Sequence, residues 1–481
     1  MPTTLIRNAS WVAAYDAAEA RHVYLQDTDV AFADDRIVHV GANFEGTADR
    51  VIDGRGRLVM PGLVNIHSHP LSEPMNKGFL DELGSPALYM SSLFEFMPIH
   101  RPDGAGMVAC ARMALAELLM SGVTTLVDLS VPYDGWFETL EQSGIRPVAA
   151  PMFRSARWFT KNGHVVEYEW DEAAGQRAMD EALALVDQAL AHPSGRFMAM
   201  VAPSQIDTCT AELIQDSVAA ARERGITVQI HAAQSVVEFH EITRRHGLTP
   251  VQWLDSLGYL GPDSIIGHGI FLDHHPRAGW LPTGDLARLI ETGTAVAHCP
   301  TVFQRRGITL RTAGRYLREG VRLGIGTDTY PHNMLEEMRA VLYLSRVLSE
   351  NVYDIRTSQV FDAATLGGAA ILKRDDLGRL APGAKADLVL VDTTAPSMQP
   401  LRDPLQSLVY VAAERAVKDV WVDGAQVVAD GKCLTLDYAE AAAAVTEAQS
   451  RAQAEIRQLD WAGRDPWTIA PPALPFGNRT P

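Results

Sequence analysis

The middle of the chain alternates short apolar runs of strand length with longer amphipathic stretches of helical length. The apolar runs predict eight strands, at residues 63–67, 124–129, 147–152, 197–202, 227–231, 264–268, 294–298 and 323–328. Amphipathic stretches between them predict helices, at residues 106–120, 171–191, 211–224, 285–292 and 311–319. Strands that alternate with helices form a parallel sheet, and eight such units predict an α/β fold of the (β/α)8 TIM barrel type.

Both ends of the chain carry short β-prone pieces punctuated by Asp, Gly and Asn. They lie at residues 4–8, 22–25, 30–32, 37–40 and 50–53, and again at 386–392, 408–412, 417–422 and 425–428. We therefore predict one small β-sandwich domain, built from residues 1–60 and 376–435, that flanks a barrel at residues 61–375. The last segment, 436–481, predicts an Ala-rich helix at 438–459 and a Pro-rich tail that lies over a surface or a partner.

Histidine and aspartate side chains gather where the predicted barrel strands end. The first strand ends in His67 and His69, which project to the same face because strand residues two apart do so. Four later strands end in ligand-type residues as well: His231, His268, His298 and Asp328. Any one of these alone is compatible with an ordinary packed polar group. Their convergence at the active-site end of a barrel predicts a metal site, because neutral imidazole binds zinc, iron and similar ions.

Composition and charge exclude several classes of protein. The 481 residues carry a net charge of -17, with no basic stripe, so we expect no nucleic-acid partner. The four cysteines lie far apart without a Cys-x-x-Cys pair, which argues against a disulfide framework and a thiolate metal site. The sequence has no signal-peptide core and no apolar run of membrane-spanning length. These features predict a cytoplasmic protein without a membrane partner.

Three ordered motifs carry a resemblance to a known family. They are Pro-Gly-Leu-Val-Asn-x-His-x-His at 61–69, Gly-Thr-Asp at 326–328, and Leu-Ala-Pro-Gly-Ala-Lys-Ala-Asp-Leu at 380–388, with lone histidines between them. Together they resemble the amidohydrolase superfamily. The closest resemblance is to the branch that contains cytosine and guanine deaminases and the chlorotriazine hydrolases. The resemblance covers nearly the whole chain and implies a homo-oligomer, a dimer or larger.

The resemblance also implies a set of site residues. The metal ligands would be His67, His69, His231 and Asp328, and His268 would hold or polarise the water and the substrate. Relatives with two metals use a lysine or a carboxylate on the fourth strand, but residues 196–206 contain neither. We therefore expect one divalent ion per chain, with Zn²⁺ favoured and Fe²⁺ or Co²⁺ as alternatives.

The expected chemistry follows from these groups. A divalent ion lowers the pKa of bound water to roughly 7, so hydroxide is available at neutral pH. Asp328 can accept the water proton and pass it to a departing nitrogen, and His268 can stabilise the developing oxyanion. The predicted reaction is hydrolysis of a non-peptide carbon–nitrogen bond of a small molecule by metal-bound hydroxide.

Departures from the branch pattern narrow the substrate class. Deaminases of this branch place a glutamate three residues after the fifth-strand histidine, where this chain has Gln234, and glutamine cannot carry a proton. The fourth-strand Ala-Pro-His pattern becomes Ala-Pro-Ser at 202–204, and Thr-Val-Phe follows His298-Cys299-Pro300. These changes favour an amide, urea or carbamate over an aminated ring. Deamination or dechlorination of a heterocycle, with Glu238 as a replacement acid, and an inactive metal-binding scaffold remain alternatives.

The remaining predicted site residues are contacts with the substrate. Gln234, His298 and His332 are the polar candidates. Six apolar residues after the first and third strands are candidates for a pocket wall, with ordinary packing as the alternative: Leu93, Phe94, Phe96, Phe153, Trp158 and Phe159. Such a wall predicts a small, partly aromatic substrate.

Overall fold

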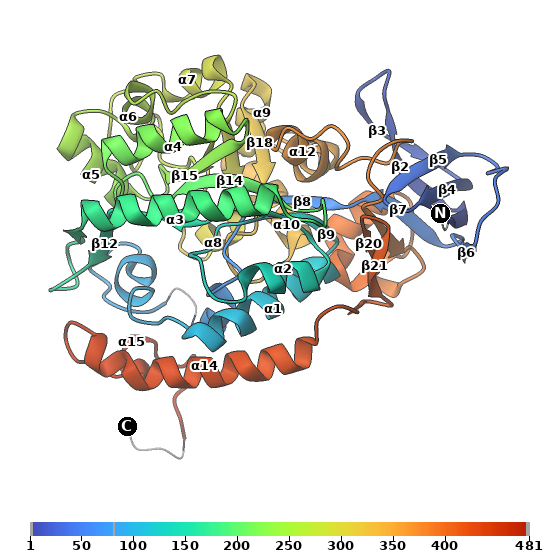
Figure 1. Cartoon of the computed structure of the whole chain (residues 1–481). Helices are drawn as coiled ribbons and strands as arrows, with labels where there is room; N and C mark the ends of the chain where they lie inside the picture. Colours follow the sequence, from blue (N-terminus) through green and yellow to red (C-terminus); the bar gives the residue numbers. More distant parts are fainter. Residues whose placement is uncertain (1–2, 80–81, 478–481) are drawn as a thin grey trace.

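The computed structural model describes residues 3–79 and 82–477. Its centre is a nearly closed barrel of parallel strands (Figure 1), which confirms the predicted fold. The barrel strands follow one another in chain order: β8 (Leu63–Ser68), β9 (Val123–Asp128), β10 (Arg146–Ala149), β14 (Met198–Pro203), β15 (Thr227–Ala232), β16 (Ser264–His268), β17 (Ala295–His298) and β18 (Arg322–Ile325). A single bridge between Ser68 and Asp328 joins the last strand to the first.

Helices cover the outside of the barrel (Figure 1). They include α1 (Gly104–Met120), α2 (Trp136–Ser143), α3 (Glu172–Leu190), α4 (Ala211–Glu223), α5 (Val236–His246), α6 (Pro250–Ser256), α7 (Asp285–Thr292), α8 (Pro300–Gln304), α9 (Ala313–Glu319), α10 (Met334–Ser349), α11 (Thr357–Asp362) and α12 (Gly368–Ile371). Several begin at a side-chain cap, as where Asp103 accepts from the Gly106 amide and Thr210 from the Leu213 amide. Strands enclosed by helices are buried on both faces, so their sequences are continuous apolar runs.

Two further sheets accompany the barrel, and the larger of them combines strands from both ends of the chain. One contains β5 (Arg36–Gly41), β4 (Thr28–Ala33), β1 (Thr3–Ala9) and β6 (Arg50–Asp53). The other contains β22 (Lys432–Cys433), β21 (Ala425–Ala429), β20 (Val417–Val422), β19 (Leu388–Asp392), β7 (Arg57–Pro61), β2 (Trp11–Asp16) and β3 (Arg21–Leu25). They share an apolar core, in which the rings of Phe32 and Trp421 lie 6.1 Å apart.

The sequence pattern missed several details of these sheets, among them the two-residue strand β22. Strands β2 and β7 were not predicted, and residues 408–412, predicted as β-prone, form a π-helical turn, η5 (Leu408–Ala412). Its buried side chains are Leu408, Val409 and Ala412. That spacing places apolar groups on one helical face, and a five-residue run is too short for periodicity to separate helix from strand.

The predicted C-terminal helix is present as α14 (Tyr438–Leu459) and lies along α1 (Figure 1). Its contact face is built of Ala441, Val445, Ala448 and Ala452, whose small side chains allow close approach. The tail beyond it, with the short helix α15 (Pro466–Ile469), lies over the chain's own 84–95 segment. There the Trp461 indole donates to Glu95 at 2.7 Å, and the Gly84 amide donates to the Ile469 carbonyl at 2.8 Å.

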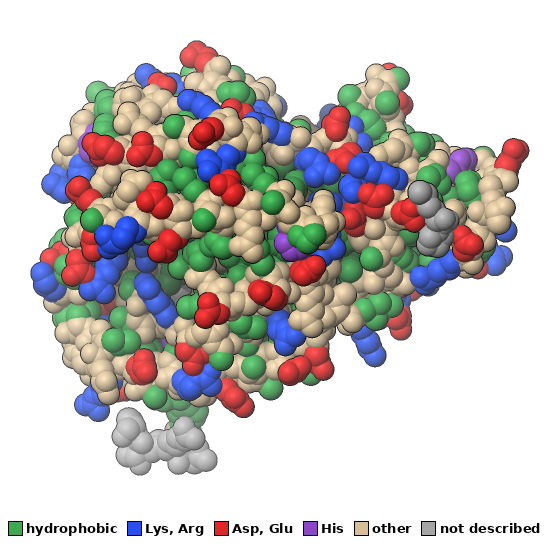
Figure 2. All heavy atoms as spheres, viewed as in Figure 1, with side chains coloured by type: hydrophobic (Ala, Val, Ile, Leu, Met, Phe, Trp, Pro, Cys, Tyr) green, Lys and Arg blue, Asp and Glu red, His purple; other side chains and the backbone are tan. Residues whose placement is uncertain are grey.

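Surface features agree with the composition. Acidic and basic side chains are interspersed over the face shown in Figure 2, so that face carries no continuous basic surface. No helix in the described parts of the chain is both long and apolar enough to cross a membrane.

A buried ion pair connects the barrel to the C-terminal strands. The Arg146 guanidinium, at the start of β10, is fully buried and donates to both carboxylate oxygens of Asp387 at 3.0 Å. It also donates to Asp423 at 2.7 Å. Both aspartates lie at the ends of strands in the seven-stranded sheet, so one side chain joins the two parts of the molecule.

Replacing Arg146 with Met should lower the free energy of unfolding by about 3 to 5 kcal/mol, because Asp387 would stay buried without its counter-charge. Denaturant unfolding followed by tryptophan fluorescence measures the change. Arg55→Met, which removes an exposed ion pair to Asp53, is the matched control and should leave the midpoint nearly unchanged. Equal midpoints for the two variants would contradict this role of Arg146.

Candidate metal centre and cavity

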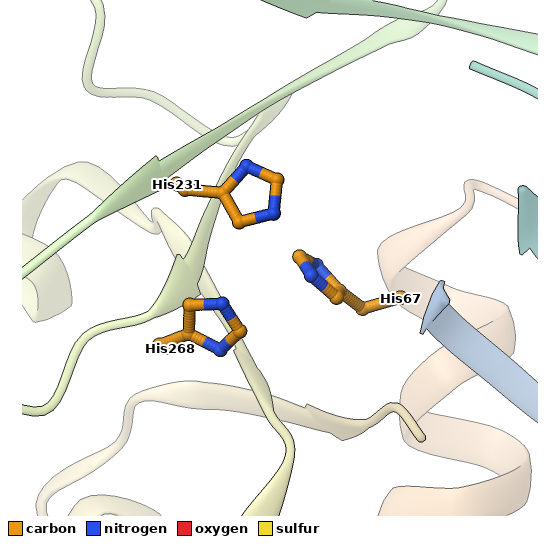
Figure 3. Close-up of side chains that lie close together, drawn as sticks. All are labelled: His67, His231 and His268. Atoms are coloured by element: carbon orange, nitrogen blue, oxygen red, sulfur yellow. The ribbon is translucent and has the colours of Figure 1, made fainter. Parts of the chain in front are cut away.

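The carboxyl ends of the barrel strands bring the predicted ligand residues together. His67 lies on β8, His69 directly after it, His231 on β15, His268 at the end of β16, and Asp328 after β18. Figure 3 shows the imidazoles of His67, His231 and His268 turned toward one another. The Nε2 atoms of His69 and His231 lie 3.1 Å apart, and Asp328 Oδ1 lies 3.2 Å from His69 Nε2 and 3.5 Å from His67 Nε2.

The tautomers of three histidines are fixed by hydrogen bonds on their outer side. Nδ1 of His69 donates to the Leu129 carbonyl at 2.7 Å, and Nδ1 of His231 donates to the Ser204 carbonyl at 2.6 Å. Nδ1 of His67 lies 2.5 Å from Gln229 Oε1, while the Gln229 amide nitrogen donates to the Ile66 carbonyl. Each ring therefore presents an Nε2 lone pair to the centre.

The donor set fits a divalent ion. His67 Nε2 is buried and has no hydrogen-bond partner among the described residues, which is the state expected of a nitrogen that serves a metal. Three imidazole nitrogens and one carboxylate are ligands that zinc and iron accept. Two overlapping groups of three offer ligand atoms that lie within 4.8 Å of one another: His67, His231 and His268, and His67, His69 and Asp328.

Charge states at the centre also suit this chemistry. Burial alone would raise the pKa of Asp328, but the neighbouring imidazoles of His268, His67 and His69 hold it well below its usual range. Burial and the neighbouring histidines lower the pKa of His231 well below its usual value, and burial does the same for His268. An ionised carboxylate therefore lies beside the neutral imidazoles of His231 and His268.

Local backbone geometry at the centre is unusual. His268 has φ +83°, Asp328 has φ +57° and Ala233 has φ +55°, all in the left-handed region that non-glycine residues rarely adopt. A Cβ on Gly326 would lie 2.6 Å from the Cβ of His67, so the Gly-Thr-Asp motif requires glycine there for close approach. Such strain collects at functional sites, where the surroundings hold it.

A cavity of about 210 Å³ opens onto the centre. It is lined by His69, His231, His268, Asp328 and Gln234, together with apolar and charged side chains from the loops after the strands. Of the six apolar candidates, Leu93 and Trp158 line the cavity and the other four do not. Phe94 packs behind Trp158, with ring centroids 5.0 Å apart.

Gln234 lies in the cavity wall, and Glu238 lies behind it. The Glu238 carboxyl accepts from the backbone amides of Ala233 at 2.6 Å and Gln234 at 3.2 Å, and it does not line the cavity. Burial raises the pKa of Glu238 well above its usual value, and the nearby Asp207 adds to this effect. Glu238 therefore holds the strand end in place and is not aimed at the cavity as a replacement acid.

His298 and His332, which the sequence analysis predicts to contact substrate, lie outside the cavity lining. Both are buried, and neither lines the cavity. Burial lowers the pKa of His298 to about 4, and it lies near His268. Nδ1 of His332 lies 3.8 Å from Glu117 on α1. The cavity lining gives no support to the prediction that these two side chains contact substrate.

Charged residues of the cavity wall were missed by the sequence analysis. They are Glu73, His100, Arg101, Arg154 and Arg306. Glu73 is buried four residues after His69, and burial raises its pKa to about 7. All five lie in connections between a barrel strand and the next long helix, with Glu73 at the start of the 3-10 turn η1 (Glu73–Asn76) and Arg306 after the short helix α8. Their position beyond a strand end is the only sequence signal that points to them.

A family model and curated relatives match this chain over most of its length. The model of the amidohydrolase family matches residues 58–427. A 5'-deoxyadenosine deaminase of Methanothermobacter thermautotrophicus is 30% identical over 426 residues, 86% of this chain and 94% of that protein. A 5-methylthioadenosine/S-adenosylhomocysteine deaminase of Natronomonas pharaonis is 29% identical over 425 residues, 87% and 91% of the two chains.

Solved structures share the fold. An adenosine deaminase from Xanthomonas campestris with bound zinc superposes with a TM-score of 0.79 at 25% identity, over 94% of this chain and 98% of that one. A triazine hydrolase variant superposes with a TM-score of 0.80 at 22% identity, over 93% and 100% of the two chains.

Proposed function

This chain belongs to the amidohydrolase family, and from that premise we propose that it hydrolyses an amide, urea or carbamate bond of a small, partly aromatic molecule. It is a metal-dependent hydrolase of carbon–nitrogen bonds that acts on small-molecule substrates. The observation that carries the proposal is Gln234, an amide in the cavity wall where a deaminase of this branch needs an acid. An acyl substrate does not need a protonated ring nitrogen.

The proposed metal ligands are His67, His69, His231 and Asp328, which hold one divalent ion. The outward hydrogen bonds of the three histidines and the unpaired Nε2 of His67 support this set. Zinc is the proposed ion, supported by the zinc in the adenosine deaminase structure, with Fe²⁺ and Co²⁺ as alternatives. When bound, the ion supplies a Lewis acid that polarises the scissile carbonyl and activates water.

The proposed catalytic residues are Asp328 and His268. Asp328, ionised at the centre, takes a proton from the attacking water and delivers it to the leaving nitrogen. His268 is a neutral imidazole whose Nε2 lies 3.8 Å from Asp328 Oδ2, and its ring packs against Phe303 at 4.6 Å. It stabilises the negative charge that develops on the carbonyl oxygen. The Gln234 amide orients the substrate through a hydrogen bond.

Deamination of an aminated heterocycle is the second candidate function. Two observations favour it: the similarity of this chain to deaminases and the Glu73 carboxyl in the cavity wall. With its pKa raised to about 7 by burial, Glu73 can exchange a proton near neutral pH. An inactive scaffold is set aside because the relatives are enzymes.

We further propose the division into a sandwich domain (1–60 with 376–435), a barrel domain (61–375) and a C-terminal segment (436–481). We also propose that the protein is cytoplasmic and forms a homo-oligomer. Exposed apolar side chains around the end of α10 support an interface there, since Val347 is 70% exposed and Tyr353 is 82% exposed.

Assays on matched substrates test the proposed reaction. Purified protein of known metal content should hydrolyse an anilide or a phenylurea with a higher kcat/KM than it deaminates an aminopurine or an aminotriazine. Turnover of the heterocycles alone would contradict the acyl proposal and establish the second candidate.

Variants of Gln234 sharpen this test. Gln234→Ala should slow acyl hydrolysis roughly two- to a hundredfold, the effect of one lost hydrogen bond. Gln234→Glu should not increase the rate of acyl hydrolysis, because a second carboxylate in the same cavity makes ionisation of Asp328 less favourable. It should raise any heterocycle deamination by about 10²- to 10⁴-fold, because it supplies a proton carrier.

The control for these variants is Gln205→Glu, which places a carboxylate elsewhere in the same cavity wall. It should not produce the gain on the heterocycle. If Gln234→Glu raised acyl hydrolysis, the orienting role of Gln234 would be wrong.

A further inference from the structure

Two arginines of the cavity wall have no acidic partner. Arg101 follows the loop after the first barrel strand, and Arg154 follows β11 (Met152–Phe153) after the third. Neither guanidinium makes an ion pair or a side-chain hydrogen bond with any residue in 3–79 or 82–477. By contrast, the buried Arg146 is neutralised by Asp387.

The charges around this pair leave a positive excess. Arg157, the third arginine nearby, forms an ion pair with Glu169 on the β12 (Ala156–Phe159) and β13 (Glu167–Trp170) hairpin. The carboxyl that acts on Arg154, Asp207, is buried and accepts from the Trp158 indole and the Tyr168 hydroxyl, both at 2.8 Å. The charge of Asp207 raises the pKa of Arg154, but neither Asp207 nor Glu73 in the cavity wall forms an ion pair with Arg101 or Arg154 among the described residues.

The two guanidinium groups also act on each other. Burial lowers the pKa of both arginines, and the charge of Arg101 lowers that of Arg154 further. Two like charges close together at a partly desolvated wall are unfavourable unless an anion joins them. A carboxylate is well suited to this role, because its hydrogen bonds with guanidinium groups are charge-assisted and match their planar geometry.

The position of the pair relative to the metal centre defines where an anion would lie. Arg101 is exposed and Arg154 is half-buried, whereas His231, His268 and Asp328 are buried. The arginines are thus on the solvent side of the cavity. Apolar side chains complete the wall between the charged groups: Leu93, Met107, Val131, Met152 and Trp158.

We propose that Arg101 and Arg154 form an anion subsite, so that the substrate is a small aromatic carboxylate whose amide or ureido group reaches the metal centre. The proposal rests on the acyl hydrolysis proposed above for the reaction at the centre. It adds that one end of the substrate is negatively charged and is held at the cavity mouth. The aromatic part lies against the apolar wall.

The test compares 4-acetamidobenzoate with neutral 4-acetamidobenzamide. Wild-type enzyme should prefer the carboxylate by roughly ten- to a hundredfold in kcat/KM, mainly through KM, as charge-assisted hydrogen bonds predict. Arg154→Gln and Arg101→Gln should each reduce this ratio, and the double variant should bring it close to one. Arg157→Gln, which removes the same charge outside the cavity, should keep the ratio.

A binding measurement separates this inference from the proposed reaction. Calorimetry with benzenesulfonate, which has no scissile bond, and with neutral methyl phenyl sulfone needs no turnover. If wild-type enzyme binds benzenesulfonate and the double variant does not, the anion subsite is supported. If the same wild-type enzyme hydrolyses neither 4-acetamidobenzoate nor 4-acetamidobenzamide, the proposed reaction is overturned. Equal kcat/KM for the two acetanilides, or an Arg157→Gln effect as large as that of Arg154→Gln, would overturn the subsite.

Discussion

Replacing Asp328 with Asn should lower kcat/KM by at least about a thousandfold. The carboxylate of Asp328 faces the Nε2 atoms of His67 and His69 at 3.5 and 3.2 Å, so it is both a proposed ligand and the proposed proton acceptor. An amide is a poor proton acceptor and a weaker ligand. General acid–base assistance is typically worth about 10² to 10⁴, and disturbed metal ligation adds to the loss.

The measurement is steady-state kinetics on the best acyl substrate, with the metal content of each preparation determined. Asp285→Asn is the matched control, since Asp285 is equally buried but accepts from Thr249 and the Asp273 amide away from the cavity. It should affect stability more than kcat/KM. An Asp328→Asn enzyme with full turnover and a full metal complement would remove Asp328 from the mechanism.

The sequence predicts the barrel because each of its strands is buried on both faces. An apolar run such as 227–231 between two amphipathic stretches is typical of a buried parallel strand, and topology then places every strand end at one rim. For this reason the sequence predicts, without knowledge of distances, that His67, His69, His231, His268 and Asp328 gather at one end of the barrel, as the structure has them. The tautomers of the histidines are not predicted, because Leu129 and Ser204 contribute backbone carbonyls, which leave no trace in residue type.

A residue at a strand end is predicted to lie near the site, but the sequence does not show whether its side chain points into the cavity. His298 ends β17 and is nevertheless absent from the cavity lining, because the packing around the strand end decides which way its side chain points. His332 lies on the loop after β18 and faces Glu117 on α1. Sequence spacing contains no information on either orientation.

Loop residues of the cavity are the least predictable part of the site. Glu73, Arg101 and Arg154 belong to irregular or very short elements, where hydrophobic periodicity gives no signal. Arg101 and Arg154 support the proposed anion subsite because neither forms an ion pair with an acidic side chain among the described residues. A missing partner is visible only in three dimensions. The proposed substrate class therefore depends on the part of the chain that sequence patterns describe least.

Removing the metal should abolish activity and lower the thermal midpoint. The four proposed ligand residues come from β8 and the residue after it, from β15 and from the loop after β18, so an ion held by them would join distant parts of the barrel. A ligand that binds only the folded state stabilises that state by about 4 kcal/mol when its free concentration is a thousand times its Kd. Chelation should therefore remove a stabilisation of this order together with turnover, and added Zn²⁺ should restore both.

Elemental analysis of the same samples decides the number of ions. One equivalent per chain is expected, because residues 196–206 offer no lysine or carboxylate to bridge a second. His231→Gln should lose the ion and the associated rise in midpoint, whereas His246→Gln, at an exposed histidine on α5, should retain both. Two tightly bound equivalents, or a midpoint that does not respond to chelation, would show that the histidine centre does not hold the single ion that the proposed reaction requires.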